Sequence, residues 1–252
     1  FYSSRCEDDM MHPSYIDVCS QDPKKILNYN HSPLMPLGKS GQFDDSGITV
    51  GSINKVNTKH FVYYTGWKRR RYGVSFELSI GVAILNDQFN TIERMFDGPI
   101  IGQSRFNPYL AAGPFVTTGR DEKYHMYYCS GSKWLHLDHG PEPLYTVYHA
   151  TSLNGLDWDV SNRNQLIKYN YDGEVISAPW VTACEHGLEM YYCFRGSRNR
   201  EEKRYRIGRA TSVDGVDWVR RDEQCGLDRS PVGWDSEMIC YPAIHRVKEK
   251  EY

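Results

Sequence analysis

The chain has 252 residues, of which 40% are apolar and 25% charged, and its formal net charge is −2. This length suits one large β-domain or two ordinary domains, and the near-neutral charge excludes a basic nucleic-acid surface as the main feature. No apolar run approaches the roughly 18 to 20 residues of a membrane span. We therefore expect no nucleic-acid partner and no membrane span.

Every predicted element is a strand, because helical periodicity is absent. Short strands over 1–5, 15–19 and 25–29 come first, and a connector rich in Pro and Gly follows over 32–41. Three sets of four strands follow, over 43–56, 60–66, 74–85 and 91–96, then 109–118, 124–131, 144–151 and 158–168, then 175–183, 188–195, 205–211 and 218–221. A last strand is predicted from Trp234.

A short aromatic segment occurs three times and sets the period of the chain. The copies read HFVYYTGW at 60–67, HMYYCSG at 125–131 and LEMYYCFRG at 188–196. Their tyrosine pairs begin at Tyr63, Tyr127 and Tyr191, so they lie 64 residues apart. A fixed period indicates a repeat architecture, and aromatic, β-branched segments of this kind predict strands buried on both faces.

Four antiparallel strands per repeat of about 60 residues are typical of a propeller blade. The predicted fold is therefore all-β, a single β-propeller domain over 1–252. Its complete blades cover about 43–97, 107–168 and 172–225, and its partial blades cover 1–31 and 234–252. If the two partial blades join, the ring closes with four blades; if the chain is clipped at both ends, the parent protein has five.

The turn between the third and fourth strands also repeats. It reads SLNGLDW from Ser152 and SVDGVDW from Ser212. Its Asn-Gly or Asp-Gly pair supplies the positive φ angles of a tight hairpin, and the tryptophan that follows is predicted to pack between blades. We interpret this turn as structural.

Acidic residues recur where the inner strands begin. Aligning these strands on Gly51, Pro114, Pro179 and Pro242 puts Asp44, Asn107, Asp172 and Asp235 at one position, and Ser46, Tyr109, Glu174 and Glu237 two residues later. Because residues two apart share a face of a strand, we predict a carboxylate ring at one mouth of the channel. Its members are Asp44, Asp172, Glu174, Asp235 and Glu237, with Asp45 adjacent.

Crowded carboxylates raise one another's pKa, as a site that needs a general acid requires. Glu237 is the member predicted to hold its proton, because Trp234, Met238 and Ile239 surround it in sequence. The alternative is that each acid separately caps a turn.

Aromatic and basic residues are predicted to complete a sugar site. Sugars stack their C–H faces on aromatic rings, and the candidates are Trp67, Trp134 and Trp180, with packing between blades as the alternative. Arg5 and Arg195 end strands that we interpret as equivalent, and they are placed to reach an acid or an anionic substrate.

The seven cysteines lack a CxxC pair and lack ligand-like spacing to histidine. This pattern predicts reduced thiols in a cytoplasmic protein, although a chain that opens without Met leaves an exported parent as an alternative. We expect no metal site and no cofactor, since no metal-ligand cluster, phosphate loop or GxSxG elbow is present.

Five segments together resemble a known family. They are FDDSG at 43–47, YYTGW at 63–67, MYYCSG at 126–131, RIGRATSVDGVDW at 206–218 and GWDSEMICYP at 233–242. They resemble the five-bladed β-propeller glycosidase-like proteins of the invertase, levansucrase and arabinanase superfamily (glycoside hydrolases 32/43/68), in particular bacterial members associated with surface-polysaccharide genes. The resemblance implies an Asp base or nucleophile, a second Asp that orients the sugar, and a Glu acid on a later blade.

Two functions follow as hypotheses. The first is a glycoside hydrolase-like enzyme that acts on an oligosaccharide or glycoside, with Asp44 or Asp45 as base or nucleophile and Glu237 or Glu174 as acid. The second is a non-catalytic sugar-binding or protein-interaction propeller. It is motivated by the missing Asp-Pro motif and by Ser177-Ala178-Pro179 where the superfamily has Glu-Gly-Pro.

Overall fold

The computed structural model describes residues 1–138, 140–247 and 250–251. In these residues every regular element is a β-strand, except for one short 3-10 helix at Asp222–Gln224. No helix in this part of the chain has the length and hydropathy that crossing a bilayer requires. The chain divides into two compact units, residues 1–102 with 243–252 (unit 1) and residues 103–242 (unit 2).

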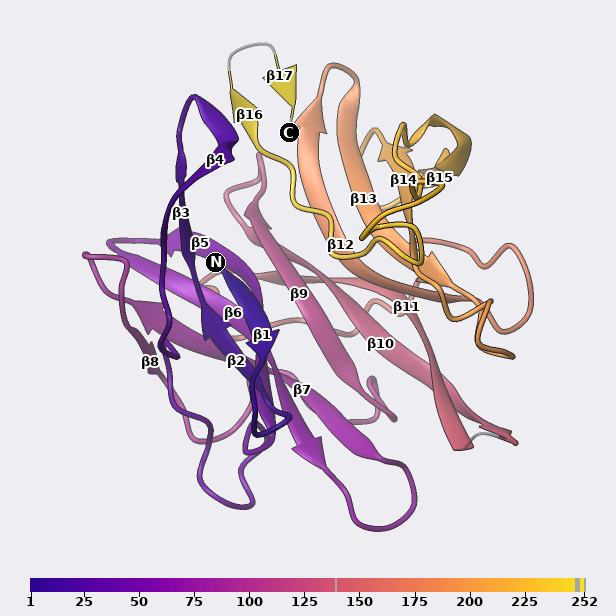
Figure 1. Cartoon of the computed structure of the whole chain (residues 1–252), viewed down its shortest axis with the longest axis horizontal. Coiled ribbons are helices and arrows are strands. Elements are labelled where there is room, and N and C mark those ends of the chain that lie inside the picture. Colours follow the sequence, from indigo (N-terminus) through magenta and orange to yellow (C-terminus); the bar gives the residue numbers. More distant parts are fainter. Residues whose placement is uncertain (139, 248–249, 252) are drawn as a thin grey trace. The chain divides into compact units, whose positions relative to one another are not determined.

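Unit 1 is built on one six-stranded sheet (Figure 1). Its order is β1 (Tyr2–Arg5), β2 (Met11–Ser14), β5 (Gly47–Val56), β6 (Lys59–Arg69), β7 (Phe76–Leu85) and β8 (Ile92–Arg94). Neighbouring strands are antiparallel except for β2 and β5, which pair in parallel. Two hairpins complete the unit, β3 (Ile16–Cys19) with β4 (Asp22–Tyr29) and β16 (Arg246–Val247) with β17 (Lys250–Glu251).

Unit 2 holds two antiparallel sheets. The first has three strands, β9 (Ala111–Thr118), β10 (Tyr124–Leu137) and β11 (Gly140–Ser152), with β10 in the middle. The second has four strands in sequence order, β12 (Val175–Cys184), β13 (Gly187–Arg195), β14 (Arg206–Ser212) and β15 (Val219–Arg220). An apolar cluster that includes Tyr127, Ile176 and Met190 lines both sheets.

The repeated tyrosine pairs lie on the middle strands β6, β10 and β13. Each of these strands pairs with a strand on either side, and side chains on both of its faces are buried. Tyr63, Tyr64, Tyr127, Tyr128 and Tyr192 are at most 1% exposed and Tyr191 is 8% exposed. The prediction of three equivalent, doubly buried strands is confirmed.

The inner strands also share a kink. The pairing register shifts at Gly51 on β5, at Gly113 and Pro114 on β9, and at Ala178 and Pro179 on β12. These β-bulges fall at the positions used to align the three strands, so that part of the sequence alignment is confirmed.

The positive φ angles predicted for the repeated turns are confirmed at the two glycines but not at Asn154 and Asp214. Gly155 and Gly215 adopt φ angles of 74° and 80°, in the left-handed region. In the second turn the indole N–H of Trp218 donates to the Gly215 carbonyl at 3.0 Å, and its ring meets Tyr127 edge-on at 5.9 Å. Trp218 thus packs a turn of one sheet against a strand of the neighbouring sheet, as predicted.

Two predicted strands are wrong. Between 158 and 168 only Asp159 forms a β-bridge, and the described residues 234–245 hold no strand. In residues 234–245 backbone N–H groups donate isolated hydrogen bonds: that of Ile239 to the Tyr205 carbonyl at 3.1 Å, and that of Tyr241 to Cys193 Sγ at 2.9 Å. Without a neighbouring strand in register, no ladder of hydrogen bonds forms.

Candidate functional site

The start of the first inner strand is tied to the sheet by a buried ion pair. Asp44 lies in the turn before β5 and its side chain is 0% exposed. Its carboxylate accepts a hydrogen bond from Tyr64 Oη at 3.0 Å and from Arg94 Nε at 2.8 Å. Burial and the neighbouring Asp44 charge raise the pKa of Tyr64 well above its ordinary value, so the phenol stays a donor.

The second repeat builds the same arrangement with a neutral partner. Asn107 Oδ1 accepts from Tyr128 Oη at 3.1 Å and from Arg163 Nη1 at 3.3 Å. The guanidinium of Arg163 also stacks over the Tyr148 ring, 3.8 Å from its centroid. In both repeats the second tyrosine of the pair therefore donates a hydrogen bond to the side chain that precedes the inner strand, Asp44 or Asn107.

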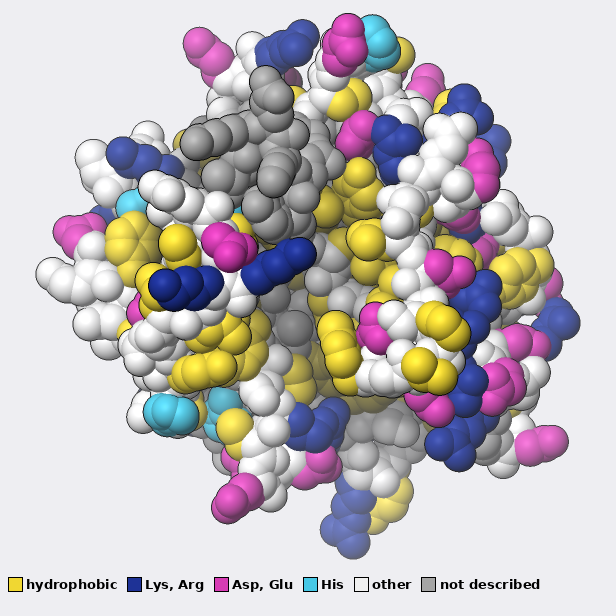
Figure 2. Space-filling model, turned by 45° about the horizontal axis from the view of Figure 1, so that its top comes forward, with side chains coloured by type: hydrophobic (Ala, Val, Ile, Leu, Met, Phe, Trp, Pro, Cys, Tyr) yellow, Lys and Arg dark blue, Asp and Glu magenta, His cyan; other side chains and the backbone are white. Residues whose placement is uncertain are grey.

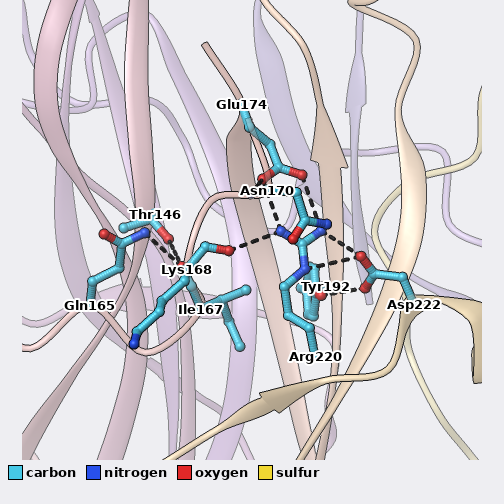
Figure 3. Close-up of polar contacts among 9 residues, drawn as sticks. All are labelled: Thr146, Gln165, Ile167, Lys168, Asn170, Glu174, Tyr192, Arg220 and Asp222. Atoms are coloured by element: carbon cyan, nitrogen blue, oxygen red, sulfur yellow. Dashed lines mark hydrogen bonds and ion pairs between the residues drawn. The ribbon is translucent and has the colours of Figure 1, made fainter. Parts of the chain in front are cut away.

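The third repeat has two carboxylates on one arginine (Figure 3). Arg220 donates to Glu174 at 2.8 and 3.0 Å and to Asp222 at 3.0 Å, and Tyr192 Oη donates to Asp222. Glu174 is 0% exposed and also accepts a hydrogen bond from the backbone N–H of Asn170 at 2.7 Å. We call these three groups the Tyr–Arg clusters, defined by Tyr64 with Arg94, Tyr128 with Arg163, and Tyr192 with Arg220.

Asp44 and Glu174, two of the predicted catalytic carboxylates, thus belong to Tyr–Arg clusters. Each carboxylate lies against a guanidinium and neither is exposed to solvent. An ion pair of this kind holds the inner strand against the edge strand of its own sheet. Asp44 Oδ1 has no hydrogen-bond partner among the described residues but is itself buried, and a buried carboxylate paired with arginine is poorly placed to exchange protons with a substrate.

The remaining predicted acids are more exposed. Asp45 is half-buried and accepts from Ser46 Oγ at 2.6 Å, and Asp235 is half-buried and accepts from Ser230 Oγ at 2.8 Å. Asp172 is 77% exposed and lies 3.2 Å from Arg198. Asp172 and Glu174 therefore do not share an environment, because both precede β12 in a turn where residues two apart need not share a face.

Glu237 does not have the apolar surroundings that were predicted for it. Its side chain is 64% exposed and lies 3.3 Å from Arg204, and the neighbouring Trp234 is 95% exposed. The prediction took the surroundings of Glu237 from its sequence neighbours at the start of a buried strand, and residues 234–245 form no strand. Asp44 and Asp45 belong to unit 1 and the other four acids to unit 2, so the carboxylate ring stays a prediction.

The predicted aromatic residues all lie on strands and are half-buried. Trp67 on β6 donates to Thr49 Oγ1 at 2.9 Å, and Trp180 on β12 packs against Phe115 at 4.9 Å between ring centroids. Trp134 lies on β10. Arg5 ends the edge strand β1 and pairs with Asp9 at 2.6 Å, so it is not equivalent to an arginine on a middle strand.

Arg195, by contrast, ends the middle strand β13 and is buried. Its guanidinium binds Glu142 at 2.6 Å and lies over the Tyr205 ring. Glu142, which also binds Lys203 at 2.7 Å, has a lowered pKa because these two cations outweigh its burial. Glu142 was not predicted as a site residue, because it stands between Pro141 and Pro143, where the sequence does not favour a strand; in the structure it lies on β11.

Arg195 is one of four arginines around a hollow of about 340 Å³ in unit 2. We call it the arginine hollow, and it is lined by Tyr171, Phe194, Arg195, Gly196, Glu201, Glu202, Arg204, Arg206 and Arg229. Elsewhere, on the face drawn in Figure 2, acidic and basic side chains lie next to one another. In the described part of the chain no group of three or more His, Cys, Asp or Glu side chains is placed to hold a metal ion.

Comparison with known proteins gives the relationship of the chain. No protein-family model matches it. It is 31% identical over 221 residues to the Mycobacterium tuberculosis protein named Uncharacterized protein Rv1502, across 87% of this chain and 70% of the relative. The protein belongs to the Rv1502 family. A second M. tuberculosis protein, MT1551, matches to the same extent.

The solved structures that are similar to this member of the Rv1502 family are glycoside hydrolases of the propeller type. A structure described as a glycoside hydrolase has a TM-score of 0.67 at 14% identity, covering 89% of this chain and 68% of its own. The structure of a BT0996 RGII complex gives 0.65 at 16% identity, covering 83% and 66%. A thermostable family-43 glycoside hydrolase gives 0.51 at 14% identity, covering 71% and 55%. The family resemblance noted in the sequence is confirmed at the level of the fold.

Proposed function

We propose that this chain is a carbohydrate-active protein that cleaves or transfers a glycosidic bond. The observation that carries the proposal is its fold, which it shares with several glycoside hydrolases at TM-scores from 0.51 to 0.67. The likeness extends over most of the chain rather than over one sheet. The substrate class we propose is an oligosaccharide or a glycoside.

The sheets are proposed to be blades of a five-bladed propeller. Supporting this are the tyrosine pairs 64 residues apart, the β-bulges at equivalent positions of β5, β9 and β12, and the two matching hairpin turns.

The proposed catalytic acids are two of the predicted acids that are not buried against arginine. Asp45 and Glu237 keep solvent access, whereas Asp44 and Glu174 are committed to Arg94 and Arg220. We therefore assign Asp44 and Glu174 a structural part in the Tyr–Arg clusters. Asp45 takes the place of base or nucleophile, and Glu237 remains the candidate acid.

A non-catalytic sugar-binding protein is the second candidate. What favours it is that two of the acids at inner-strand starts are buried against arginine, and that the third repeat has Ala178-Pro179 at its bulge in place of an acidic motif. A binding protein needs hydrogen-bonding groups and stacking rings but no free general acid.

The two candidates separate in one experiment. Purified protein is incubated with neutral and acidic oligosaccharides, and released reducing ends are measured by anion-exchange chromatography. Glycoside cleavage that falls by at least about a hundredfold in Asp45→Asn and Glu237→Gln, the usual range for a lost acid or base, supports the enzyme. Glu185→Gln, an exposed acid on unit 2, is the matched control. Binding without turnover, unchanged in Glu237→Gln, identifies the binding protein instead.

A further inference from the structure

We propose that the arginine hollow binds the anionic group of an acidic sugar, a carboxylate or a phosphate. The inference rests on the proposed carbohydrate function and specifies the substrate class for it. Four guanidinium groups and two carboxylates, Glu201 and Glu202, line the hollow. The proposal depends on which of the guanidinium groups form an ion pair, and on the aromatic residues of the lining.

Two of the four arginines have carboxylate partners within the protein. Arg195 binds Glu142 at 2.6 Å. Arg204 lies 2.8 Å from Glu201 and 3.3 Å from Glu237. These pairs fix the guanidinium groups in place and leave them close to neutral in sum.

The other two arginines have none among the described residues. Arg206, at the start of β14, is exposed and forms no ion pair there. Arg229 is half-buried and donates only to the Glu237 carbonyl, at 3.1 Å, while its Nε is buried without an acceptor. A guanidinium carries five N–H donors, so Arg206 and Arg229 keep donors that an anion in the hollow can use.

Arginine suits a planar or tetrahedral anion better than any other residue does. Its guanidinium offers donors in a fixed fork that bind carboxylate or phosphate through two parallel hydrogen bonds. Partial desolvation in a hollow strengthens such contacts relative to those on an open surface.

The hollow also suits the rest of a sugar. Tyr171 and Phe194 both line it; Tyr171 is 45% exposed and Phe194 is half-buried. Aromatic rings next to polar groups are the usual lining of sites for such ligands. A volume of about 340 Å³ lies at the lower end of the range for small-molecule sites, so it suits one sugar unit.

Calorimetric titration of the whole chain tests the proposal with four probes: glucuronic acid, glucose 6-phosphate, glucose and inorganic phosphate. We expect at least one of the two acidic sugars to bind at least about tenfold more tightly than glucose. Arg206→Met and Arg229→Met should each weaken that binding by about tenfold, as the loss of a charged hydrogen bond does. Arg221→Met, an exposed arginine outside the hollow, should leave it unchanged, and circular dichroism verifies that each variant is folded.

The acidic probe that binds more tightly identifies the anionic group. Equal affinities for glucose and both acidic sugars, or variants that all behave like Arg221→Met, would overturn the anion site while leaving a carbohydrate function intact. If inorganic phosphate binds, its binding is weakened in both hollow variants and no sugar binds, the hollow is an anion site. That result would remove the support for a carbohydrate ligand. If none of the four probes binds, the proposal is wrong.

Discussion

Replacing Arg220 by methionine should strongly destabilise unit 2. Arg220 supplies two of the three hydrogen bonds that the Glu174 carboxylate accepts, and it is the counter-ion of that carboxylate. Because Glu174 is 0% exposed, water cannot take over either function. Breaking a buried pair and leaving one charge behind costs about 3 to 5 kcal/mol, a large share of the 5 to 15 kcal/mol that typically stabilises a domain.

The measurement is urea unfolding followed by tryptophan fluorescence, which reports mainly on unit 2 because five of the six tryptophans lie there. Glu174→Gln and the double variant complete a double-mutant cycle. The double variant should recover at least about 2 kcal/mol relative to the sum of the two single losses, since no unpaired charge remains. Arg221→Met, the exposed neighbour, should change stability by less than about 0.5 kcal/mol. A loss below about 1 kcal/mol in Arg220→Met, or strict additivity in the cycle, would refute a structural ion pair.

Two further predictions concern unit 2. Burial, with a smaller contribution from the neighbouring imidazole, lowers the pKa of His149 from 6.5 to about 4. Between pH 6.5 and pH 4 the unfolded chain therefore binds a proton at His149 that the native state does not bind. The neutral His149 thus contributes about 3 kcal/mol to the free energy of unfolding, a contribution that is complete above pH 6.5 and is lost as the pH falls to 4. His149→Gln should make the unfolding free energy nearly independent of pH across that window, whereas substitution of the exposed His186 by Gln should not. If the two variants show the same pH profile of unfolding free energy, His149 is not the group responsible. Gly215→Ala should cost about 2 to 3 kcal/mol, because φ is +80° and the added Cβ would lie 2.9 Å from Tyr127 Oη. Gly226→Ala, with φ +74° and no atom within 4 Å, should cost about 1 kcal/mol, and thermal melts in which the two variants match would show that crowding is unimportant.

Local pattern was enough to predict most of the strands and their equivalence. The tyrosine pairs of β6, β10 and β13 lie at a fixed period, and the bulges near Gly51, Pro114 and Pro179 fall at equivalent positions. Successive side chains of these strands point to opposite faces, and a strand that is buried on both faces has an apolar and aromatic sequence throughout. The turn residues Gly155 and Gly215 were equally predictable, because a positive φ depends on the residue itself.

The partners of the acids were decided only by the tertiary structure. Arg94, Arg163 and Arg220 follow their tyrosines at unequal distances along the chain, so no period reveals that they meet Asp44, Asn107 and Glu174. The burial of a carboxylate depends on contacts from distant strands, which spacing does not encode.

Residues 234–245 illustrate the same limit in the opposite direction, because their pattern predicts a strand that has no neighbour in register. The sequence by itself thus determined the repeat, the all-β class and the turns, since these depend on local chemistry. The tertiary structure decided which acids are locked by arginine, which stay open to solvent and where guanidiniums gather around a hollow, because those properties arise from side chains that only folding brings together.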